Sequence, residues 1–565
     1  MCEKTTVFRT FFCYLLTKFF FKSKIKILFL IKVDFMTERK KRNGFASGIG
    51  FILAAAGSAV GLGNLWSFPY KTSANGGAAF VFVYILSVII IGSIVMIAEI
   101  YLGKRAQANP VTAMKKANNH LGWIGLFSII IPLLIICYYS ILGGYTIKYT
   151  MNSFEKNSEI MASFTGNIGE VIMYTAIFMI LALVVVMAGV KGGIEKASKV
   201  LMPALFLILV FIVIYCLCLG NGVAEGLSYY LNPDFGALGF DGILAAMGQA
   251  FFSLSLGMGI MVAYGSYTGT KVKVGQSVIM ICVFDTFVAL LAGLAIFPAI
   301  YHYKATTGID LKTNGIILLF SSMPIIFETL GWFGQIVSFL FFGMVVIAAL
   351  TSVISLLEVV TQFVIQKFRL HRKKAIMVVA LICFALSIPI SISLGYALNG
   401  SSVMQILGND LLTFVDDITN AVLMPVCALG SCIAIGWFVV KANKPKDHFN
   451  PMHLYRGLCE DGLHLGWFGK VFAVMVKYIT PVLIAFIEVM GVINFIVPVG
   501  DNGVREFSNY GLLVVLTAYA LLAIAIAVYY IFFRKCDTGC NADEIDIAMA
   551  ASLDADEKDE EAAAE

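Results

Sequence analysis

Charged side chains are scarce in this sequence. Asp, Glu, Lys and Arg make up 13% of its 565 residues, whereas hydrophobic residues make up 59%. Soluble globular domains carry about 25% charged residues, so this composition excludes a soluble fold. Apolar segments close to the ~20 residues that a helix needs to cross a bilayer recur along the whole chain. The sequence therefore predicts an all-α membrane protein.

Motifs of several other function classes are missing as well. The six histidines form no His-Glu-x-x-His pair of a zinc hydrolase. The chain has neither a nucleophile elbow nor a phosphate-binding loop. Its twelve cysteines lack the spacing of a disulfide framework, and its basic residues form no patch interleaved with aromatics, as nucleic-acid binding would need. We therefore expect a protein that is not an enzyme and that does not use ATP.

Apolar segments of sufficient length predict twelve transmembrane spans. They cover approximately residues 46–69, 79–102, 121–150, 169–189, 198–220, 242–265, 276–302, 332–366, 375–396, 411–440, 468–499 and 510–534. An even number of spans puts both termini on the same side. Lysine and arginine concentrate in one alternate set of loops, for example at 39–42, 367–374 and 441–446. By the positive-inside rule these loops and both termini are cytoplasmic, and we expect a multi-pass protein of the plasma membrane.

The two ends of the chain differ from the rest. Lysines interrupt residues 1–35 too often for a span, and no cleavage site of a signal peptide follows. Met36 opens a short basic stretch that looks like a natural start. We interpret residues 1–35 as an over-called start or a surface-lying basic segment, and residues 36–45 as a cytoplasmic N-terminus. Residues 541–565 are rich in Ala, Asp and Glu, which predicts a disordered acidic tail.

Two spans contain residues that break a helix. The first span includes AGSAVGLGNLWSFPYK at 56–71, and the sixth includes FFSLSLGMG at 251–259. Irregular backbone occurs at membrane depth only where it is buried in protein or lines a cavity. The two breaks lie five spans apart, so an inverted repeat with a substrate site at the midplane is expected. Helix ends there offer N–H groups to an anion and carbonyls to a cation. Close packing of helices at small residues is the alternative.

The motifs around these breaks resemble a known family. They are AGSAVGLGNLWSFPY, NGGAAF at 75–80, GQAFFSLSLGMG at 248–259, YGSY at 264–267, FDTFVALLAGLAIFP at 284–298 and AALTSVISLLE at 348–358. They resemble the neurotransmitter:sodium symporter family, with its LeuT-type fold, over about residues 40–535. The resemblance implies one transporter domain at 46–535. It would hold a 5+5 inverted repeat (spans 1–5 at about 46–220, spans 6–10 at about 242–440), broken helices 1 and 6, and two additional helices at about 468–534.

Position by position, the resemblance implies two sodium sites built from oxygen atoms, the ligands that hard cations prefer. The first would use the Ala59 carbonyl, Asn64, Ser253, Asp285 and the carboxylate of the substrate. The second would use the Gly57, Val60 and Ala348 carbonyls and the hydroxyls of Thr351 and Ser352. Taken alone, Thr351 and Ser352 would more often be hydrogen-bonding residues between helices.

The implied amino-acid site lies between the two breaks. Its carboxylate would accept from the backbone of Leu62 and Gly63 and from the Tyr139 hydroxyl. Its ammonium would face carbonyls around Phe252, Ser253 and Ser255. Phe252 would cover the pocket, while Met258 and Val353 would line its apolar part. Methionine is adaptable, so several substrate side chains could fit.

Two positions limit which class of substrate and which ions are expected. Gly61 stands where family members that carry monoamines have Asp, which implies a substrate with its own carboxylate, a neutral and apolar or aromatic amino acid. Asp285 is an ionisable residue inside a span and is functional by default. Many animal relatives have Asn there and need chloride. A fixed carboxylate can offset the charge of sodium at low dielectric, so we expect chloride-independent transport.

The gates are where this chain departs from the family pattern. Ser67 replaces an Arg that closes the outer side against an acid in span 10, here Asp416 or Asp417. Lys71 lies one turn further out and could pair with that acid.

On the inner side, Arg42 matches the gating Arg of the family and Tyr267 matches its tyrosine neighbour. The usual acid partner falls near Gln366, which carries no charge. Two more acids lie within spans. Glu358 is expected to be buried and hydrogen-bonded near the inner pathway, and Glu99 to lie near the inner surface.

These features favour a sodium-coupled symporter that imports an amino acid by alternating access, in which sodium and substrate each form part of the other's site. A ligand-gated or leak cation channel, or a sensor, is a second interpretation, because broken helices also line channels. A membrane enzyme is the third. The sequence leaves open whether the protein forms a homodimer.

Overall fold

The computed structural model describes residues 44–155, 160–269, 272–313, 315–400, 403–440, 449–498 and 506–533. Throughout these ranges the regular structure is helical, with a single β-bridge between Ile406 and Asn409. The predicted surface segment, the acidic tail and Arg42 lie outside the described residues.

The helices belong to the unit Asn43–Glu565, and most of the predicted spans consist of one long helix or of helices joined end to end. The first half contains α2 (Gly48–Ala59), η2 (Gly63–Ser67), α3 (Phe68–Ala74), α4 (Ala78–Ser87), η3 (Val88–Gly92), α5 (Ser93–Ala106), α6 (Pro110–Ala117), η4 (Asn119–Leu121), α7 (Gly122–Met151), α8 (Ile160–Gly166), α9 (Ile168–Met187), η6 (Val190–Ile194), α10 (Glu195–Leu217) and α11 (Val223–Leu231).

The second half contains α12 (Phe240–Ser253), α13 (Ile260–Gly265), α14 (Val274–Thr307), α15 (Gly315–Ile317), η7 (Leu318–Ser322), α16 (Met323–Thr329), α17 (Gly331–Phe368), α18 (Arg372–Leu398), α19 (Leu411–Asp417), η8 (Ile418–Leu423), α20 (Met424–Ile433), η9 (Ala434–Val439), α22 (Pro451–Glu460), α23 (Phe468–Val474), η10 (Met475–Ile479), α24 (Thr480–Ile496), α25 (Asn509–Val528) and η11 (Tyr529–Phe533).

Ten of the described helices are long and apolar enough to cross a membrane, and an eleventh span is obtained if a bent pair is counted as one. The pair joins Gly48–Ala59 to Gly63–Ala74 with a bend of 45°. The predicted sixth span consists of α12 and α13, which are too short to be counted separately. The protein is therefore a multi-pass membrane protein, while the count of twelve and the inverted repeat stay predictions.

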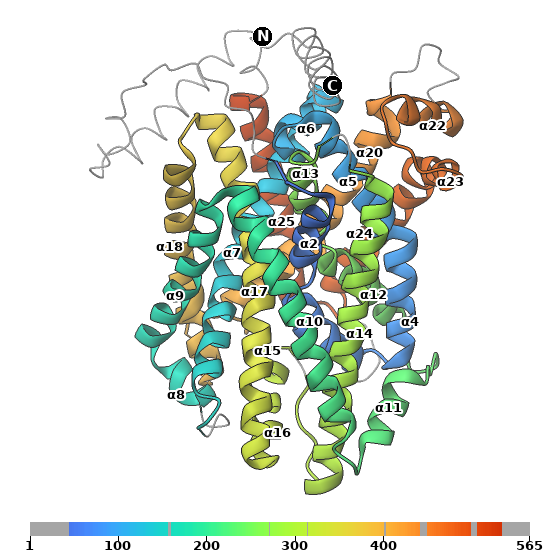
Figure 1. The fold of residues 1–565 in the computed structure, drawn as a ribbon. Coiled ribbons are helices and arrows are strands. Elements are labelled where there is room, and N and C mark those ends of the chain that lie inside the picture. The colour runs from blue at the N-terminus through green and yellow to red at the C-terminus, as the bar shows by residue number, and fades with distance from the viewer. Residues whose placement is uncertain are drawn as a thin grey trace, which may run out of the picture. The chain divides into compact units, whose positions relative to one another are not determined.

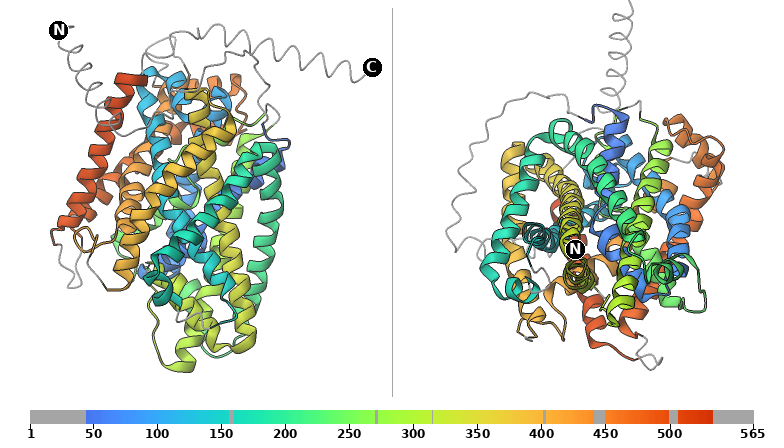
Figure 2. Two further views of the ribbon diagram at one scale, coloured as in Figure 1. Left: turned by 90° about the vertical axis from the view of Figure 1, so that its left-hand side faces the viewer. Right: turned by 60° about the horizontal axis from the view of Figure 1, so that its bottom comes forward.

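The first broken helix lies inside the bundle. Figure 1 shows α2 in blue among the longer helices, and it packs against α10, α14 and α17. By contrast α25, drawn in red, lies at the edge of the bundle in the left view of Figure 2. In α7 and α17, 72% of the most apolar window is buried within the protein, against 28% in the last span. Helix α17, which packs against α2, is therefore among the most deeply buried of the described helices.

Candidate functional site

The first break begins where α2 ends at Ala59. Val60 turns to an extended conformation (φ −72°, ψ 102°), and the helix resumes only at Gly63. The last turn of a helix leaves carbonyl groups without an amide four residues on. One of them, the Ser58 carbonyl, accepts the hydroxyls of Ser255 (3.0 Å) and Ser352 (3.2 Å). At the break, one main-chain oxygen thus binds side chains of two other spans.

The second break occupies the six residues between α12 and α13. Ser255, Gly257 and Gly259 all have left-handed backbone, with φ of 54°, 74° and 69°. For Ser255 this conformation is costly, and such strain tends to occur at functional positions. A Cβ at Gly257 would lie 2.3 Å from the Met424 carbonyl, so only glycine fits there.

Glu99 holds this second break from the side. Its Oε1 accepts the Gly257 amide at 3.0 Å and the Ser431 hydroxyl at 3.4 Å, and the side chain is buried. Glu99 lies one turn before the basic residues at 103–105, and its carboxylate faces the break in span 6. A place near the inner surface stays a prediction.

Three residues predicted for the first sodium site meet around a carboxylate. The Asn64 amide nitrogen donates to Asp285 Oδ1 (2.9 Å), to the Asp285 carbonyl (3.1 Å) and to Ser253 Oγ (3.1 Å). Ser253 Oγ donates to Asp285 Oδ2 at 2.8 Å. Tyr84 adds its hydroxyl, 3.3 Å from Asp285 Oδ2. Asp285 is fully buried, and none of the ion pairs found in the described ranges involves it.

A buried carboxylate without a cationic side chain beside it calls for a cation from elsewhere. Ala59 lies at the edge of the same region, where it lines the central cavity. The oxygen atoms of Asp285, Ser253 and Tyr84 are ligands of the kind that a hard cation such as sodium prefers. Asn64 presents its amide nitrogen to them, while its own oxygen accepts the Gly61 amide at 3.1 Å. Sequence reasoning missed Tyr84, which follows the NGGAAF motif by only a few residues and is a polar side chain within a span.

The residues predicted for the second sodium site lie where α17 approaches the end of α2. A Cβ added at Gly57 would lie 3.5 Å from Thr351 Cβ, so the two helices are nearly in contact. The Thr351 hydroxyl donates within its own helix, to the carbonyls of Ile347 (3.1 Å) and Ala348 (3.0 Å). The predicted ligands are neighbours, and their hydroxyls take main-chain partners in this structure. Val60, whose carbonyl completes the predicted set, is buried at the break.

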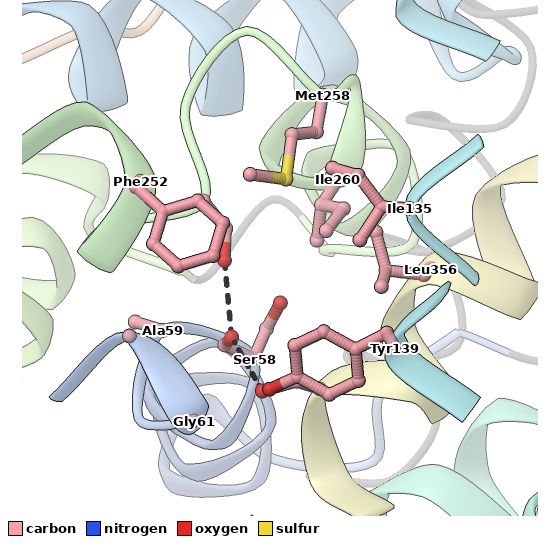
Figure 3. Close-up of a pocket in the computed structure, with 12 residues that line it drawn as sticks. Ser58, Ala59, Gly61, Ile135, Tyr139, Phe252, Met258, Ile260 and Leu356 are labelled. Carbon is pink, nitrogen blue, oxygen red and sulfur yellow. Dashed lines mark hydrogen bonds between the residues drawn. The ribbon is translucent and has the colours of Figure 1, made fainter. Parts of the chain in front are cut away.

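A cavity lies between the two breaks (Figure 3). It is lined by Ser58, Ala59, Gly61, Gly63, Ile135, Tyr139, Phe252, Ser255, Met258, Ile260, Ser352 and Leu356. On one side are the backbone of the first break and the Tyr139 hydroxyl, and on the other are apolar side chains including Phe252, Met258 and Leu356. The Leu62 amide donates to the Tyr139 hydroxyl at 2.9 Å. A polar end and an apolar end are thus separated within one small space.

The lining differs from the sequence prediction in one respect. Val353 is buried but lies outside the cavity lining, because one position along a helix turns the side chain by about 100° away from the face of Ser352. Leu356, one turn beyond Ser352, takes that place. Gly61 is tightly surrounded: a Cβ would lie 2.3 Å from Ser352 Oγ and 2.7 Å from the Tyr139 hydroxyl.

On the side of α3, the predicted ion pair is not formed. The Lys71 ammonium donates to Gln249 Oε1 at 3.1 Å, and the Ser67 hydroxyl donates to the same oxygen at 2.7 Å. Gln249 in turn donates to the Gly63 carbonyl at 2.8 Å. The ion pairs of the described residues do not join Lys71 to Asp416 or Asp417.

The two acids of span 10 bind neutral partners instead. Asp416 Oδ1 accepts from the Tyr138 hydroxyl at 2.6 Å and from Asn420 at 2.7 Å, and Asp417 accepts from Tyr510 at 2.8 Å. Sequence reasoning missed Gln249, although it stands in the GQAFFSLSLGMG motif, because a neutral amide gives no sign of which cation it binds.

On the side of α13, Glu358 is fully buried, as expected, and binds Tyr267 and Arg372. The Tyr267 hydroxyl donates at 2.7 Å, and the Arg372 guanidinium binds both carboxylate oxygens. Gln366 accepts both from the Asn109 amide and from its side chain, at 3.0 and 2.7 Å. An ion pair therefore exists on this side, but its base comes from the start of α18.

The helical fold, the two breaks with the cavity between them, and the buried carboxylate beside the first break are the features of a membrane transporter. Residues 42–160 and 157–538 match the sodium:neurotransmitter symporter family. The chain belongs to this family, and it is a sodium-dependent symporter rather than a channel or an enzyme.

Individual relatives span nearly the same region. The chain is 33% identical over 478 residues to an uncharacterized sodium-dependent transporter, YhdH, of Bacillus subtilis, covering 81% of this chain and all of the relative. A sodium-dependent nutrient amino acid transporter 1 of Drosophila persimilis is 22% identical and matches 82% of this chain and 77% of its own length. The crystal structure of MhsT in complex with L-phenylalanine superposes with a TM-score of 0.71 at 34% identity, covering 80% of this chain and all of that one.

Proposed function

We propose that this protein imports a neutral amino acid with an apolar or aromatic side chain, together with two sodium ions and without chloride, by alternating access across the plasma membrane. Both termini would be cytoplasmic, and assembly as a homodimer stays open. The observation that carries the proposal is the fully buried Asp285, held by Asn64, Ser253 and Tyr84 beside the first break.

The polar end of the cavity suits an amino-acid backbone. The substrate carboxylate would take the Leu62 and Gly63 amides and the Tyr139 hydroxyl, breaking the 2.9 Å contact between Leu62 and Tyr139. Ala59 and Asn64 would hold the first sodium ion against that carboxylate. The Gly57, Val60 and Ala348 carbonyls with Thr351 and Ser352 would hold the second. Sodium and substrate would then raise each other's affinity equally, as linkage requires.

The apolar end of the cavity supports a neutral side chain. Ile135, Met258, Ile260 and Leu356 line it, together with Phe252, and no lysine, arginine, aspartate or glutamate is among its lining residues in the described chain. A charged substrate side chain would lose its hydration there without gaining a partner.

The same apolar lining can be tested with the purified protein. Thermal stabilisation would be measured with each of the twenty amino acids, in sodium and in potassium buffer. We expect apolar and aromatic amino acids to raise the melting temperature in sodium buffer but not in potassium buffer, and the rise should grow with ligand concentration, as binding to the folded state requires. Tyr139→Phe should need at least a tenfold higher amino-acid concentration for the same rise. Equal stabilisation in potassium would contradict sodium coupling.

Chloride independence depends on the charge of Asp285. Uptake into proteoliposomes would be compared in chloride and in gluconate. We expect the wild type to take up substrate at the same rate in both buffers. Uptake by Asp285→Asn should be at least tenfold slower in gluconate than in chloride. Glu225→Gln, at an exposed position of α11, is the matched control. If Asp285→Asn transports equally well without chloride, the charge argument is wrong.

The cluster around α3 and the cluster around α13, which both lie outside the cavity lining, are suited to act as gates. We assign the outer gate to Ser67, Lys71 and Gln249 with Asp416 and Asp417 nearby. The inner gate is assigned to Tyr267, Glu358 and Arg372, and a part for Arg42 stays a prediction.

A further inference from the structure

The N-terminal end of α2 is clamped by a carboxylate from another span. Glu195, the first residue of α10, accepts the Ala46 amide on Oε2 at 2.7 Å and the Ser47 hydroxyl on Oε1 at 3.0 Å. Ser47 is the N-cap of α2, and its hydroxyl also accepts the Gly50 amide at 3.0 Å. The Glu195 side chain is 2% exposed, whereas Ala46 is exposed and Ser47 is half-buried, so these contacts form at the edge of the packed interior.

The chemistry of a helix start explains why a carboxylate fits there. The first amides of a helix have no partner within the helix, and the aligned peptide dipoles favour negative charge at this end. The first turn of α2 contains no acidic residue of its own. Glu195 therefore supplies from α10 the charge that α2 lacks, and Lys199 balances it from one turn along α10 at 2.7 Å.

The fit between the two helices is tight at one glycine. A Cβ at Gly50 would lie 2.0 Å from Glu195 Oε1, so any side chain there would displace the carboxylate. A Cβ at Gly48, two residues earlier on the same helix, would meet nothing within 4 Å. The contact between Glu195 and α2 thus needs a residue without a side chain at position 50, whereas position 48 has room for one.

The other contacts of this end are main-chain or apolar. The Phe45 amide donates to the Tyr267 carbonyl at 3.1 Å, and the Phe45 ring packs edge-on against Phe51 and Tyr264. Among the residues that the structure describes near this end, Glu195 thus brings a negative charge to the helix start. The C-terminal end of the same helix carries Gly57 and Ala59, which are proposed sodium ligands.

We propose that Glu195 is a positioning residue that latches the start of α2 to α10, and that release of this latch accompanies opening of the inner side of the pathway. Alternating access needs an element with two discrete positions. Helix α2 ends in the ion site at one end and in the latch at the other, so its displacement would change both together. This role rests on the proposed transport cycle, whereas the latch itself does not.

Hydrogen exchange measured by mass spectrometry tests the latch on the full-length protein in sodium-free potassium buffer. We expect Glu195→Ala to speed exchange of the amides at 46–53 at least tenfold, with Glu195→Gln intermediate because it keeps one acceptor oxygen. Gly50→Ala should act like Glu195→Ala. Gly48→Ala is the control and should leave exchange within twofold of the wild type.

Two results would overturn the latch. Exchange at 46–53 within twofold of the wild type in Glu195→Ala would show that the contact does not hold α2. An equal rise at 511–528 in α25 would mark a general loss of stability instead.

Transport kinetics test the second half of the inference. In proteoliposomes, Glu195→Ala should raise the sodium concentration for half-maximal uptake at least threefold. Its melting temperature in potassium buffer should stay within about 2 °C of the wild type, so that a general loss of stability does not account for the change. An unchanged sodium dependence, together with faster exchange, would mean that the latch exists but is not coupled to the ion site. That outcome would leave sodium-coupled uptake itself intact.

Discussion

The two sides of the cavity are closed by different chemistry. Around α3, the cation Lys71 binds the neutral Gln249, and the acids of span 10 bind tyrosines and an asparagine. Around α13, Glu358 binds Arg372 through both oxygens and is fully buried. Both clusters contain charge-assisted hydrogen bonds, but only the one around α13 joins two opposite charges through a bidentate pair, which adds energy and geometric specificity. On the gate assignment proposed above, the inner side would therefore cost more free energy to open than the outer side.

Removing Glu358 should have the largest effect. Glu358→Ala leaves the Arg372 guanidinium without its carboxylate, and breaking a buried pair from one side costs about 3–5 kcal/mol. We expect this loss in the free energy of unfolding, measured by SDS titration in mixed micelles. The double variant with Arg372→Met should recover part of it. A loss below about 1 kcal/mol in Glu358→Ala would remove the distinction between the two sides.

Removing Gln249 should have a smaller effect. Gln249→Leu deprives Lys71, Ser67 and the Gly63 carbonyl of one shared partner, and an unsatisfied buried polar group costs about 1–3 kcal/mol. The same SDS titration measures it, with Gln276→Leu at an exposed position of α14 as the control. A loss as large as that of Glu358→Ala would show that the cluster around Gln249 is held just as firmly as the pair of Glu358 and Arg372.

Restoring the arginine of the family pattern should have the smallest effect. In Ser67→Arg the new guanidinium could bind Asp416, which would stabilise the closed outer side by about 1 kcal/mol, the scale of a partly exposed pair. We expect uptake to be about fivefold slower, since tenfold corresponds to about 1.4 kcal/mol. Asp416→Asn in the same background should restore the rate. Faster uptake would contradict the assignment of Ser67 to the outer gate.

Sequence reasoning located the breaks because their cause is local. Glycine destabilises a helix, and Gly61, Gly257 and Gly259 lie in the breaks themselves. Ser253 and Asp285 stand in motifs that are visible in the sequence. In the structure, Asn64 and Ser253 both bind the carboxylate of Asp285.

What the sequence could not supply was the phase of each helix against its neighbours. Val353 and Leu356 differ by less than one turn, yet only Leu356 lines the cavity. Glu99 was expected near the inner surface and faces the second break. The partner of Lys71 was expected to be an acid and is an amide. Each of these three contacts depends on which neighbouring helix the side chain faces. Tertiary packing decides that, and the spacing of residues in the sequence does not.

The Ser58 carbonyl has a consequence for the kinetics of the helix that carries it. It accepts one hydroxyl from the second break and one from α17. If the second break and α17 moved in different directions, this carbonyl would lose at least one of the two hydroxyls, and a buried hydroxyl without a partner costs about 1–3 kcal/mol. Positions of α2 that keep only one bond would therefore be less populated than positions that keep both. In the proposed transport cycle, these two hydrogen bonds would favour discrete positions of the end of α2 over intermediate ones.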